Sequence, residues 1–153
     1  MMSNKIIISK LKIFTDIHSN FVIDIYNKHN SKTDSNLGNK TLLEFISIFQ
    51  SNKRISKGSI FFEVTNAKKE LIGIIETEKN HLTLLYIKND NQHNGIGTLC
   101  IEELKSKLGN YSEITVCASP YSVVFYVKNG FKKIKSEIQE TKGINYYHMK
   151  LDL

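Results

Sequence analysis

Residues 87–98 read Ile-Lys-Asn-Asp-Asn-Gln-His-Asn-Gly-Ile-Gly-Thr, a polar loop that ends in two glycines. The leucine-rich segment before it, from His81 to Lys88, has the composition of a strand. After Gly95 the apolar residues recur at helical spacing, and Gly109 stands where a helix would stop. The stretch therefore joins a strand to an amphipathic helix through a loop that contains glycine.

This junction has the chemistry of a phosphate site. Glycine lets backbone N–H groups approach an anion closely, and a helix N-terminus adds unpaired donors and the positive end of a dipole. The loop is not a P-loop, because the Gly-Lys-Ser/Thr ending is absent, and it lacks the third glycine of a dinucleotide fingerprint. Taken alone, it fits a phosphate cradle and an ordinary tight turn equally well.

Strand patterns lie on both sides of the junction. Ser59 to Thr65 and Leu71 to Thr77 predict a hairpin, since the intervening residues 66–70 have the composition of a turn. Downstream, Ile114 to Ala118 predicts a strand. The helix after Gly95 would connect it to the strand before the junction as a parallel crossover.

The two ends of the chain complete the element order. A first strand is expected over Ile6 to Leu11. Ser119-Pro120 has the pattern of an N-cap followed by proline at the first helical position, and Gly130 closes this short helix. Phe131 to Ile138 and Ile144 to Leu151 are expected to form an antiparallel pair.

Two helices are predicted between the first strand and the hairpin. The first carries apolar residues at helical spacing from Phe21 to Tyr26. The polar stretch from Asn27 to Lys40 has the composition of a loop. Thr41-Leu42-Leu43-Glu44 fits a capping box, so the second helix is expected to begin there, with Phe45 and Phe49 in its buried stripe. The expected fold is a single α/β domain over residues 1–153, a mixed, mostly antiparallel sheet with a central parallel pair and flanking helices.

The amino-acid composition argues against several classes of function. Of the 153 residues, 41% are hydrophobic and 24% charged, as in an ordinary globular domain. No apolar run is long enough to span a membrane, and the N-terminus lacks a signal-peptide pattern, so a cytoplasmic protein is expected. Cys100 and Cys117 are expected to be reduced core residues, and the histidines have no metal-ligand spacing. The net charge of +6 is spread along the chain rather than clustered, which argues against a nucleic-acid partner.

Two motifs, in order and at the expected separation, resemble those of the GNAT acetyltransferase superfamily. Residues 92–97, Gln-His-Asn-Gly-Ile-Gly, match the signature Gln/Arg-x-x-Gly-x-Gly/Ala. Residues 125–131, Phe-Tyr-Val-Lys-Asn-Gly-Phe, resemble the family helix Phe-Tyr-x-x-x-Gly-Phe. The ending Gly-Ile-Asn-Tyr-Tyr-His-Met at residues 143–149 also resembles one subgroup. The likeness runs from about Leu71 to the C-terminus.

The resemblance implies an N-acetyltransferase that moves the acetyl group of acetyl-CoA to a primary amine by direct attack in a ternary complex. The pyrophosphate would lie on the first motif, on Gln92, His93, Asn94, Gly95, Ile96, Gly97 and Thr98. The pantetheine arm would lie where the parallel pair splays in this family, along Leu85, Tyr86 and Ile87 and near Ser119, Ser122 and Tyr126. The acceptor groove would be formed by the N-terminal helices and the late hairpin, and the family also includes homodimers. Ser119 stands where many relatives have asparagine, and His93-Asn94 replaces a small and basic pair, which puts the affinity for CoA in doubt.

Two residues are candidates for proton transfer. Tyr126 shares one face of its short helix with Ser119 and Ser122, and in the family this tyrosine donates a proton to the leaving thiolate. Glu76, on the hairpin strand, points away from the side of Gly73 and Ile75 and could accept the proton of the amine. A solvated strand carboxylate explains Glu76 equally well. A non-catalytic acetyl-CoA-binding or regulatory module on the same fold is the alternative function.

Overall fold

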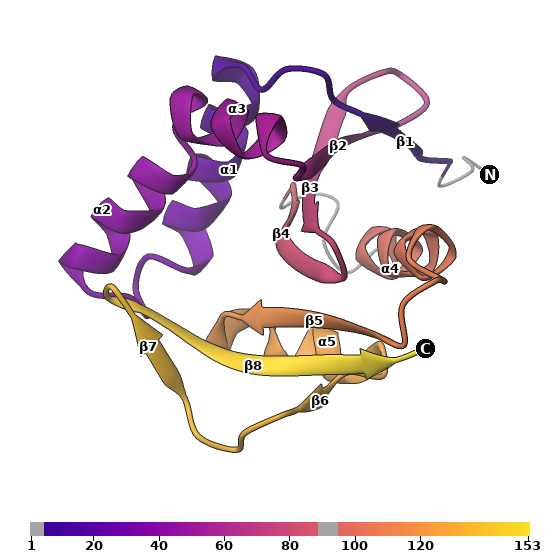
Figure 1. Ribbon diagram of the computed structural model, residues 1–153. Helices are drawn as coiled ribbons and strands as arrows, with labels where there is room; N and C mark the ends of the chain where they lie inside the picture. The colour runs from indigo at the N-terminus through magenta and orange to yellow at the C-terminus, as the bar shows by residue number, and fades with distance from the viewer. Residues whose placement is uncertain (1–4, 89–94) are drawn as a thin grey trace.

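One sheet runs through the computed structural model, which describes residues 5–88 and 95–153 (Figure 1). Its strand order is β1-β2-β3-β4-β5-β8-β6, with β7 paired to β8 alone. All neighbours are antiparallel except β4 and β5, which are parallel. The strands are β1 Ile7–Lys10, β2 Ile60–Thr65, β3 Leu71–Glu78, β4 His81–Ile87, β5 Glu113–Ala118, β6 Lys132–Lys133, β7 Gln139–Thr141 and β8 Ile144–Asp152. The mixed α/β sheet with a central parallel pair is confirmed.

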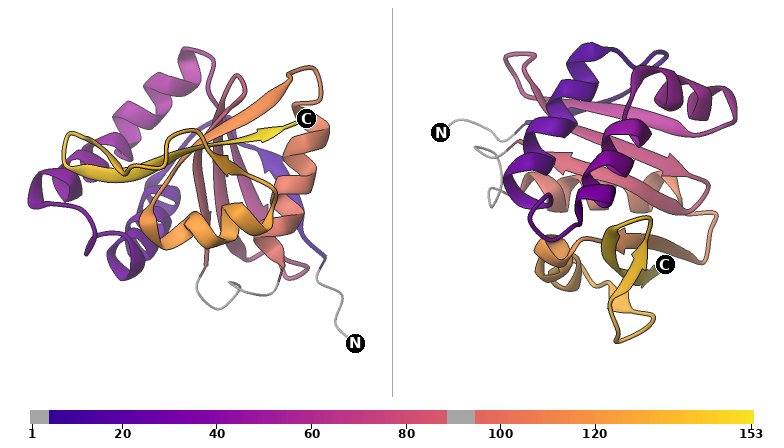
Figure 2. Two further views of the ribbon diagram at one scale, coloured as in Figure 1. Left: turned by 90° about the horizontal axis from the view of Figure 1, so that it is seen from below. Right: turned by 90° about the vertical axis from the view of Figure 1, so that its left-hand side faces the viewer.

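Helices cover both faces of this sheet (Figures 1 and 2). The three helices before β2 gather on one face, and α4 and α5 lie on the other. The helices are α1 Asp16–His29, α2 Asn36–Phe45, α3 Ile48–Ser56, α4 Ile96–Lys107, the 3₁₀ turn η2 Pro120–Ser122 and α5 Val123–Lys128. Within the described residues, none of them combines the length and apolarity needed to cross a bilayer.

Two hydrophobic cores result from this arrangement. On one face, side chains of α4 such as Ile101 and Leu104 pack against strand residues such as Ile75 and Leu82. On the other face, Val22 of α1 packs with strand residues that include Ile74 and Leu84. The adjacent residues Ile74 and Ile75 of β3 point to opposite cores, as the two-residue period of a β-strand requires.

The N-terminal helices differ from the prediction. Three are present rather than two, and α2 begins at Asn36, where the Ser35 side chain accepts a hydrogen bond from the Gly38 N–H. Thr41 therefore lies inside a helix and is not its cap. A break at Ser47 separates α2 from α3, and the resulting rotation leaves Phe49 70% exposed.

The late hairpin also differs from the prediction. The strand expected over Phe131 to Ile138 is interrupted, since within it only β6 pairs with β8, and β7 begins after it, at Gln139. Lys133 pairs with Met149 and Gln139 pairs with Tyr146, so more residues lie between the pairs on the first strand than on the second. The extra residues between β6 and β7 do not pair with β8 and form a loop. The parallel crossover through α4 and the hairpin of β2 and β3 are confirmed.

Candidate functional site

The parallel pair β4–β5 separates after two residue pairs. His81 pairs with Thr115 and Leu82 with Val116, and the ladder ends there. The pairing of β4 with β3 shifts at the same level, because Glu76 faces Leu84 while Thr77 faces Leu82. Thr83 is thus an extra residue in β4, a β-bulge, and bulges bend the strand that carries them. The bend turns the carboxyl-terminal part of β4 away from β5.

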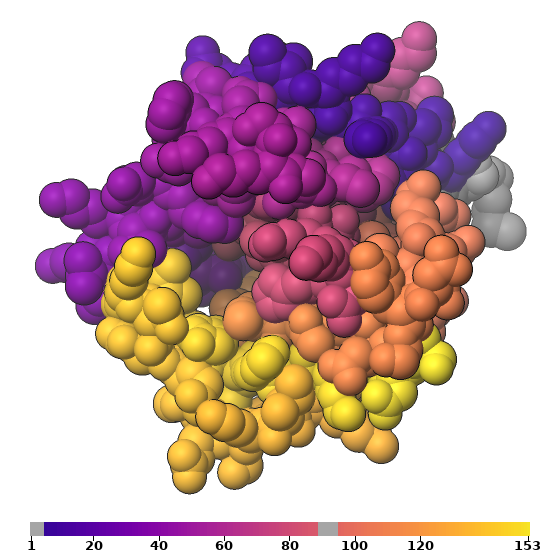
Figure 3. Space-filling view, in the orientation of Figure 1, coloured from indigo at the N-terminus to yellow at the C-terminus, as the bar shows by residue number. Residues whose placement is uncertain are grey.

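A cavity of about 790 Å³ lies where the two strands part. It runs from the start of α4, past η2 and α5, to the first two helices and the start of β8. In the space-filling view the surface is hollowed between the purple N-terminal helices and the yellow β7–β8 segment (Figure 3). Its lining includes Leu85, Tyr86, Ile87, Gly95, Gly97, Thr98, Ser119, Ser122 and Tyr126. The structure therefore brings together the described residues that the sequence assigned to a cofactor site, apart from Ile96.

The end of the cavity next to α4, with η2 and α5, is called the glycine end below. Gly95 has φ +80°, the left-handed region that favours glycine, and stands at the N-cap of α4. A Cβ on Gly97 would lie 2.6 Å from a ring carbon of Phe125, so this glycine makes room for the aromatic ring of α5. The Ile96 side chain is buried in the core and does not line the cavity. Gln92, His93 and Asn94 lie outside the described residues.

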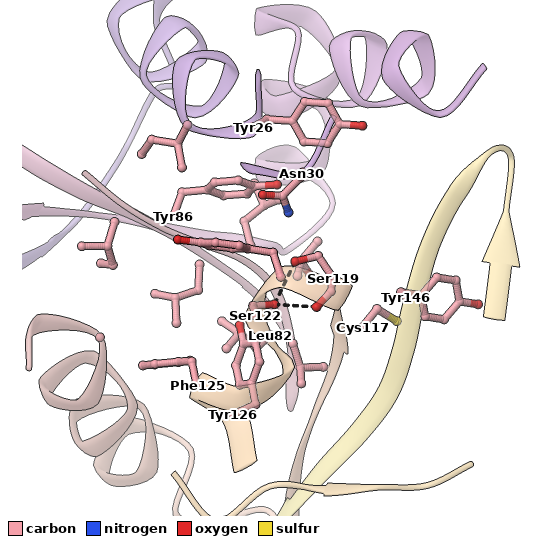
Figure 4. A pocket seen from close by; sticks show the side chains of 18 of the residues that line it. Tyr26, Asn30, Leu82, Tyr86, Cys117, Ser119, Ser122, Phe125, Tyr126 and Tyr146 are labelled. Carbon is pink, nitrogen blue, oxygen red and sulfur yellow. Dashed lines mark hydrogen bonds between the residues drawn. The ribbon is translucent and has the colours of Figure 1, made fainter. Parts of the chain in front are cut away.

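Tyr126 lies at the glycine end between two aromatic rings. Its ring meets those of Phe125 and Phe131 edge to face, each at a centroid distance of 5.1 Å, and only 5% of the residue is exposed. Burial raises the pKa of its phenol, so the hydroxyl stays protonated at neutral pH. In Figure 4 this hydroxyl points toward the part of the cavity that Ser122 lines.

Ser119 and Ser122 form a pair beside Tyr126. Their hydroxyl oxygens lie 2.9 Å apart, and the Ser122 hydroxyl also donates to the Ser119 carbonyl (Figure 4). Ser119 occupies the N-cap position before Pro120, as the sequence predicted, but its side chain makes no capping bond. Its hydroxyl is engaged with Ser122 instead.

The opposite end of the cavity, called the helix end below, is formed by α1, α2, the segment between them and the start of β8. The Tyr26 hydroxyl donates to Asp34 Oδ2 at 2.6 Å, and Asp34 Oδ1 accepts from the Asn145 backbone N–H at 2.8 Å. These bonds fasten the α1–α2 connection to β8. Burial and the nearby Asp34 charge raise the pKa of Tyr26 and of Tyr86, which stands on β4.

Glu76 does not line this cavity, which corrects the expectation of an accessible base. Its side chain is 0% exposed and accepts two hydrogen bonds from the Arg54 guanidinium, at 2.9 and 3.0 Å. Arg54 in turn lies over the Phe45 ring and donates to the Phe45 carbonyl. Burial raises the pKa of the Glu76 carboxyl, although the guanidinium opposes the shift. The pair ties α3 and the end of α2 to β3.

Three further groups of the sequence prediction can be placed. His81 lines the cavity, with Nδ1 2.7 Å from the Thr115 hydroxyl, and burial lowers its pKa so that the neutral imidazole is favoured. Cys100 is buried as expected, and burial raises the pKa of its thiol to about 12. Cys117 was expected in the core but is exposed and lines the cavity, because it alternates with the buried Val116 and Ala118 along β5.

The sequence did not single out the residues of the helix end. Tyr26, Asn30, Asp34, Phe45 and Asn145 line it. The first four come from segments without a site motif, and Asn145 lies in the ending at residues 143–149, whose resemblance assigned no role to it. Two of them lie in the polar stretch that had the composition of a loop. Only the general expectation that the N-terminal helices and the late hairpin form a groove pointed to them.

The sequence was compared with models of known protein families and with curated proteins. Residues 30–153 match the family model described as an acetyltransferase (GNAT) domain. No protein with a curated description matches the sequence.

Solved structures share the fold. A GCN5-related N-acetyltransferase from Rhodopseudomonas palustris has 15% identity and a TM-score of 0.74, with 100% of this chain and 99% of that chain covered. The PaiA N-acetyltransferase from Thermoplasma acidophilum, solved with coenzyme A, has 21% identity and a TM-score of 0.73, with 97% and 99% covered. A variant of the spermidine N-acetyltransferase SpeG from Vibrio cholerae has 18% identity and a TM-score of 0.65, with 98% and 95% covered.

Proposed function

The chain belongs to the GNAT acetyltransferase family, and from this premise we propose that it transfers the acetyl group of acetyl-CoA to a primary amine inside the cavity between β4 and β5. The observation that carries the proposal is the two-residue pairing of these strands. It opens a continuous cavity that joins the glycine turn before α4 to Tyr126 and to the helix end.

The glycine end has the chemistry that CoA requires. A Cβ added at Gly95 would meet no atom of residues 5–88 or 95–153 within 4 Å, so the described part of the chain leaves room for a ligand beside this turn. The N-terminus of α4, a helix of 12 residues, directs unpaired backbone N–H groups there. Lys128 on α5 also lines the cavity and adds a cation for a phosphate. Along β4, the backbone of Leu85 to Ile87 would hold the pantetheine arm.

Acetyl-CoA supplies an acyl group already activated as a thioester. In the proposed reaction the amine nitrogen bonds to the acetyl carbon, the carbon–sulfur bond breaks, and the amine loses its proton to solvent. Tyr126 gives its phenolic proton to the departing thiolate and recovers it from solvent. The aromatic rings beside Tyr126 keep its hydroxyl in place for this step.

Turnover with a library of amines tests the proposal. Acetyl-CoA labelled in the acetyl group would be incubated with the protein and each amine, and the labelled product detected by mass spectrometry. This readout is preferable to a thiol reagent, because the protein carries thiols of its own at Cys100 and Cys117. We expect a labelled amide from at least one amine. Binding of acetyl-CoA without any product would instead support the non-catalytic module, and absence of binding would contradict both.

A further inference from the structure

Asp34 is the carboxylate that lines the cavity. Among the described lining residues the full charges are those of Asp34 and Lys128, since burial favours the neutral form of His81. Lys128 belongs to α5, at the glycine end. Asp34 belongs to the α1–α2 connection, at the helix end. The described lining of the cavity is therefore positive at one end and negative at the other.

The carboxylate of Asp34 retains capacity for a ligand. An ionised carboxylate has about four acceptor positions, and the described partners Tyr26 and Asn145 occupy two of them. Within residues 5–88 and 95–153, no lysine or arginine forms an ion pair with Asp34. Because the Asp34 carboxylate is held in place and has no cationic partner among these residues, it can pair with a cationic group of a substrate.

The surroundings of Asp34 also favour a cation. Tyr26 is hydrogen-bonded to Asp34, Tyr146 follows Asn145 along β8, and Tyr86 lines the same cavity, and aromatic faces attract positive charge. The influence of the Asp34 charge extends to Tyr86 on β4, where it contributes to the raised pKa of that phenol. A cationic group in this part of the cavity would meet one carboxylate and several ring faces.

The helix end is separate from the place of acetyl transfer. Figure 4 shows Tyr26 and Asn30 on one side of the cavity and Ser122 and Tyr126 on the other, with Tyr86 between them. Asp34 lies beside the Tyr26 hydroxyl, which donates a hydrogen bond to it. A cation at Asp34 is therefore not the group that reacts beside Tyr126.

We propose that Asp34 binds a second, non-reacting cationic group of the acceptor, so that this enzyme prefers linear diamines and longer polyamines over monoamines and amino acids. One ammonium group is held by Asp34 and the surrounding rings, while the other amine, as the neutral base, reaches the thioester. The inference rests on the proposed function and names its substrate class.

The variant Asp34→Asn separates this role from a structural one. An asparagine at this position can still accept the Asn145 N–H through its Oδ1. Its Nδ2 can donate to the Tyr26 hydroxyl, whose own proton can then go to Asn39 Oδ1, 2.9 Å away. The variant removes the charge and preserves the shape. Asp24→Asn is the matched control, since Asp24 is an exposed carboxylate on α1 that does not line the cavity.

The experiment measures binding and turnover with matched pairs of ligands. Unbranched diamines from 1,3-diaminopropane to 1,8-diaminooctane would be compared with monoamines of equal chain length. Calorimetry gives Kd for each without acetyl-CoA, and labelled-product formation gives KM and kcat. In the wild type we expect kcat/KM for one diamine to exceed that of its monoamine by at least tenfold, because a monoamine that reacts has no second ammonium group for Asp34. In Asp34→Asn this advantage should fall by about tenfold to a hundredfold, the range for losing a charged hydrogen bond.

The outcomes are distinguishable. The inference is overturned if the wild type acetylates diamines and monoamines with equal kcat/KM, or if Asp34→Asn lowers kcat/KM of both classes to the same degree. It is also overturned if Asp24→Asn reproduces the effect. Turnover of monoamines alone would overturn the inference and leave the proposed function standing. Asp34-dependent binding of diamines without turnover of any amine would support the site and contradict the proposed function.

Discussion

Tyr126 is the residue on which the chemistry of the proposed transfer depends. Phenylalanine at this position keeps the ring between Phe125 and Phe131 and removes only the hydroxyl. We therefore expect Tyr126→Phe to lower kcat by about tenfold to a thousandfold while KM for acetyl-CoA changes little, since one proton donor is lost. Steady-state kinetics with the best acceptor would measure both parameters.

Tyr111→Phe is the matched control for this prediction, because Tyr111 is an exposed tyrosine that does not line the cavity. It should leave kcat unchanged. If Tyr126→Phe retained full turnover, Tyr126 would be a packing residue and the leaving thiolate would take its proton from water.

Glu76 was a candidate base in the sequence, but in the structure it forms a buried ion pair with Arg54. Glutamine at this position would leave the Arg54 guanidinium largely buried without its counter-charge. Removing one partner of a buried pair costs about 3–5 kcal/mol of unfolding free energy. Glu78→Gln, on the same strand and exposed, should cost close to nothing.

Denaturant unfolding of the two variants measures these costs, and turnover per folded molecule should be preserved in Glu76→Gln. The opposite pattern, normal stability with turnover lost, would restore Glu76 as the base that the sequence suggested.

At the scale of elements, the contact between α2 and the β7–β8 turn shapes the helix end. Gly38 lies against Gly143, so that a Cβ on Gly38 would overlap the Gly143 carbonyl. The Ser35 N–H also donates to that carbonyl. Alanine normally stabilises a helix relative to glycine by roughly 1 kcal/mol. At Gly38 we expect the reverse sign, a destabilisation of about 1–3 kcal/mol from overpacking.

Thermal unfolding of Gly38→Ala would measure the effect. Gly109→Ala is the control, because a Cβ there would make only ordinary contacts, at 3.5 Å and beyond. Equal, slightly stabilising effects of the two substitutions would show that α2 does not depend on this contact.

The same contact explains why sequence patterns misplaced α2. Residues 36–40, Asn-Leu-Gly-Asn-Lys, contain glycine and asparagine, which favour loops. The helix forms because tertiary packing on β8 stabilises it, and packing of this kind outweighs propensity. The strands β2, β3 and β4 were predictable as short apolar segments bounded by turn residues, and helix α4 by apolar residues that recur at helical spacing. The interruption between β6 and β7 depends on register with β8, which no local pattern encodes.

The two ends of the cavity also differ in how far the sequence predicts their residues. The residues of the glycine end follow from a contiguous motif, since a turn at the start of a helix is a local structure. Asp34 and Asn145 meet only because the α1–α2 connection folds over β8. A single aspartate in a polar segment has no distinguishing signal before that contact is known, and the buried ion pair of Glu76 with Arg54 likewise needs the packed helices.

At the scale of the whole molecule, the net charge of +6 should assist the capture of an anionic cosubstrate. We expect the association rate of acetyl-CoA, followed by stopped-flow fluorescence of a labelled analogue, to fall as salt rises from about 20 to 200 mM, since screening shortens the reach of the field. A matched acetyl thioester of pantetheine, which has no phosphates, should show no such dependence. If the two ligands responded alike, the charge would play no part in capture.

We expect acetyl-CoA to bind the folded chain between β4 and β5. A ligand that binds only the native state stabilises it by about 2.7 kcal/mol at a hundredfold excess over Kd. For a domain of 153 residues this corresponds to a rise in Tm of roughly 5–10 °C. Thermal unfolding of the wild type with increasing acetyl-CoA is the most direct test, and we predict such a rise. An unchanged Tm at millimolar acetyl-CoA would contradict the account.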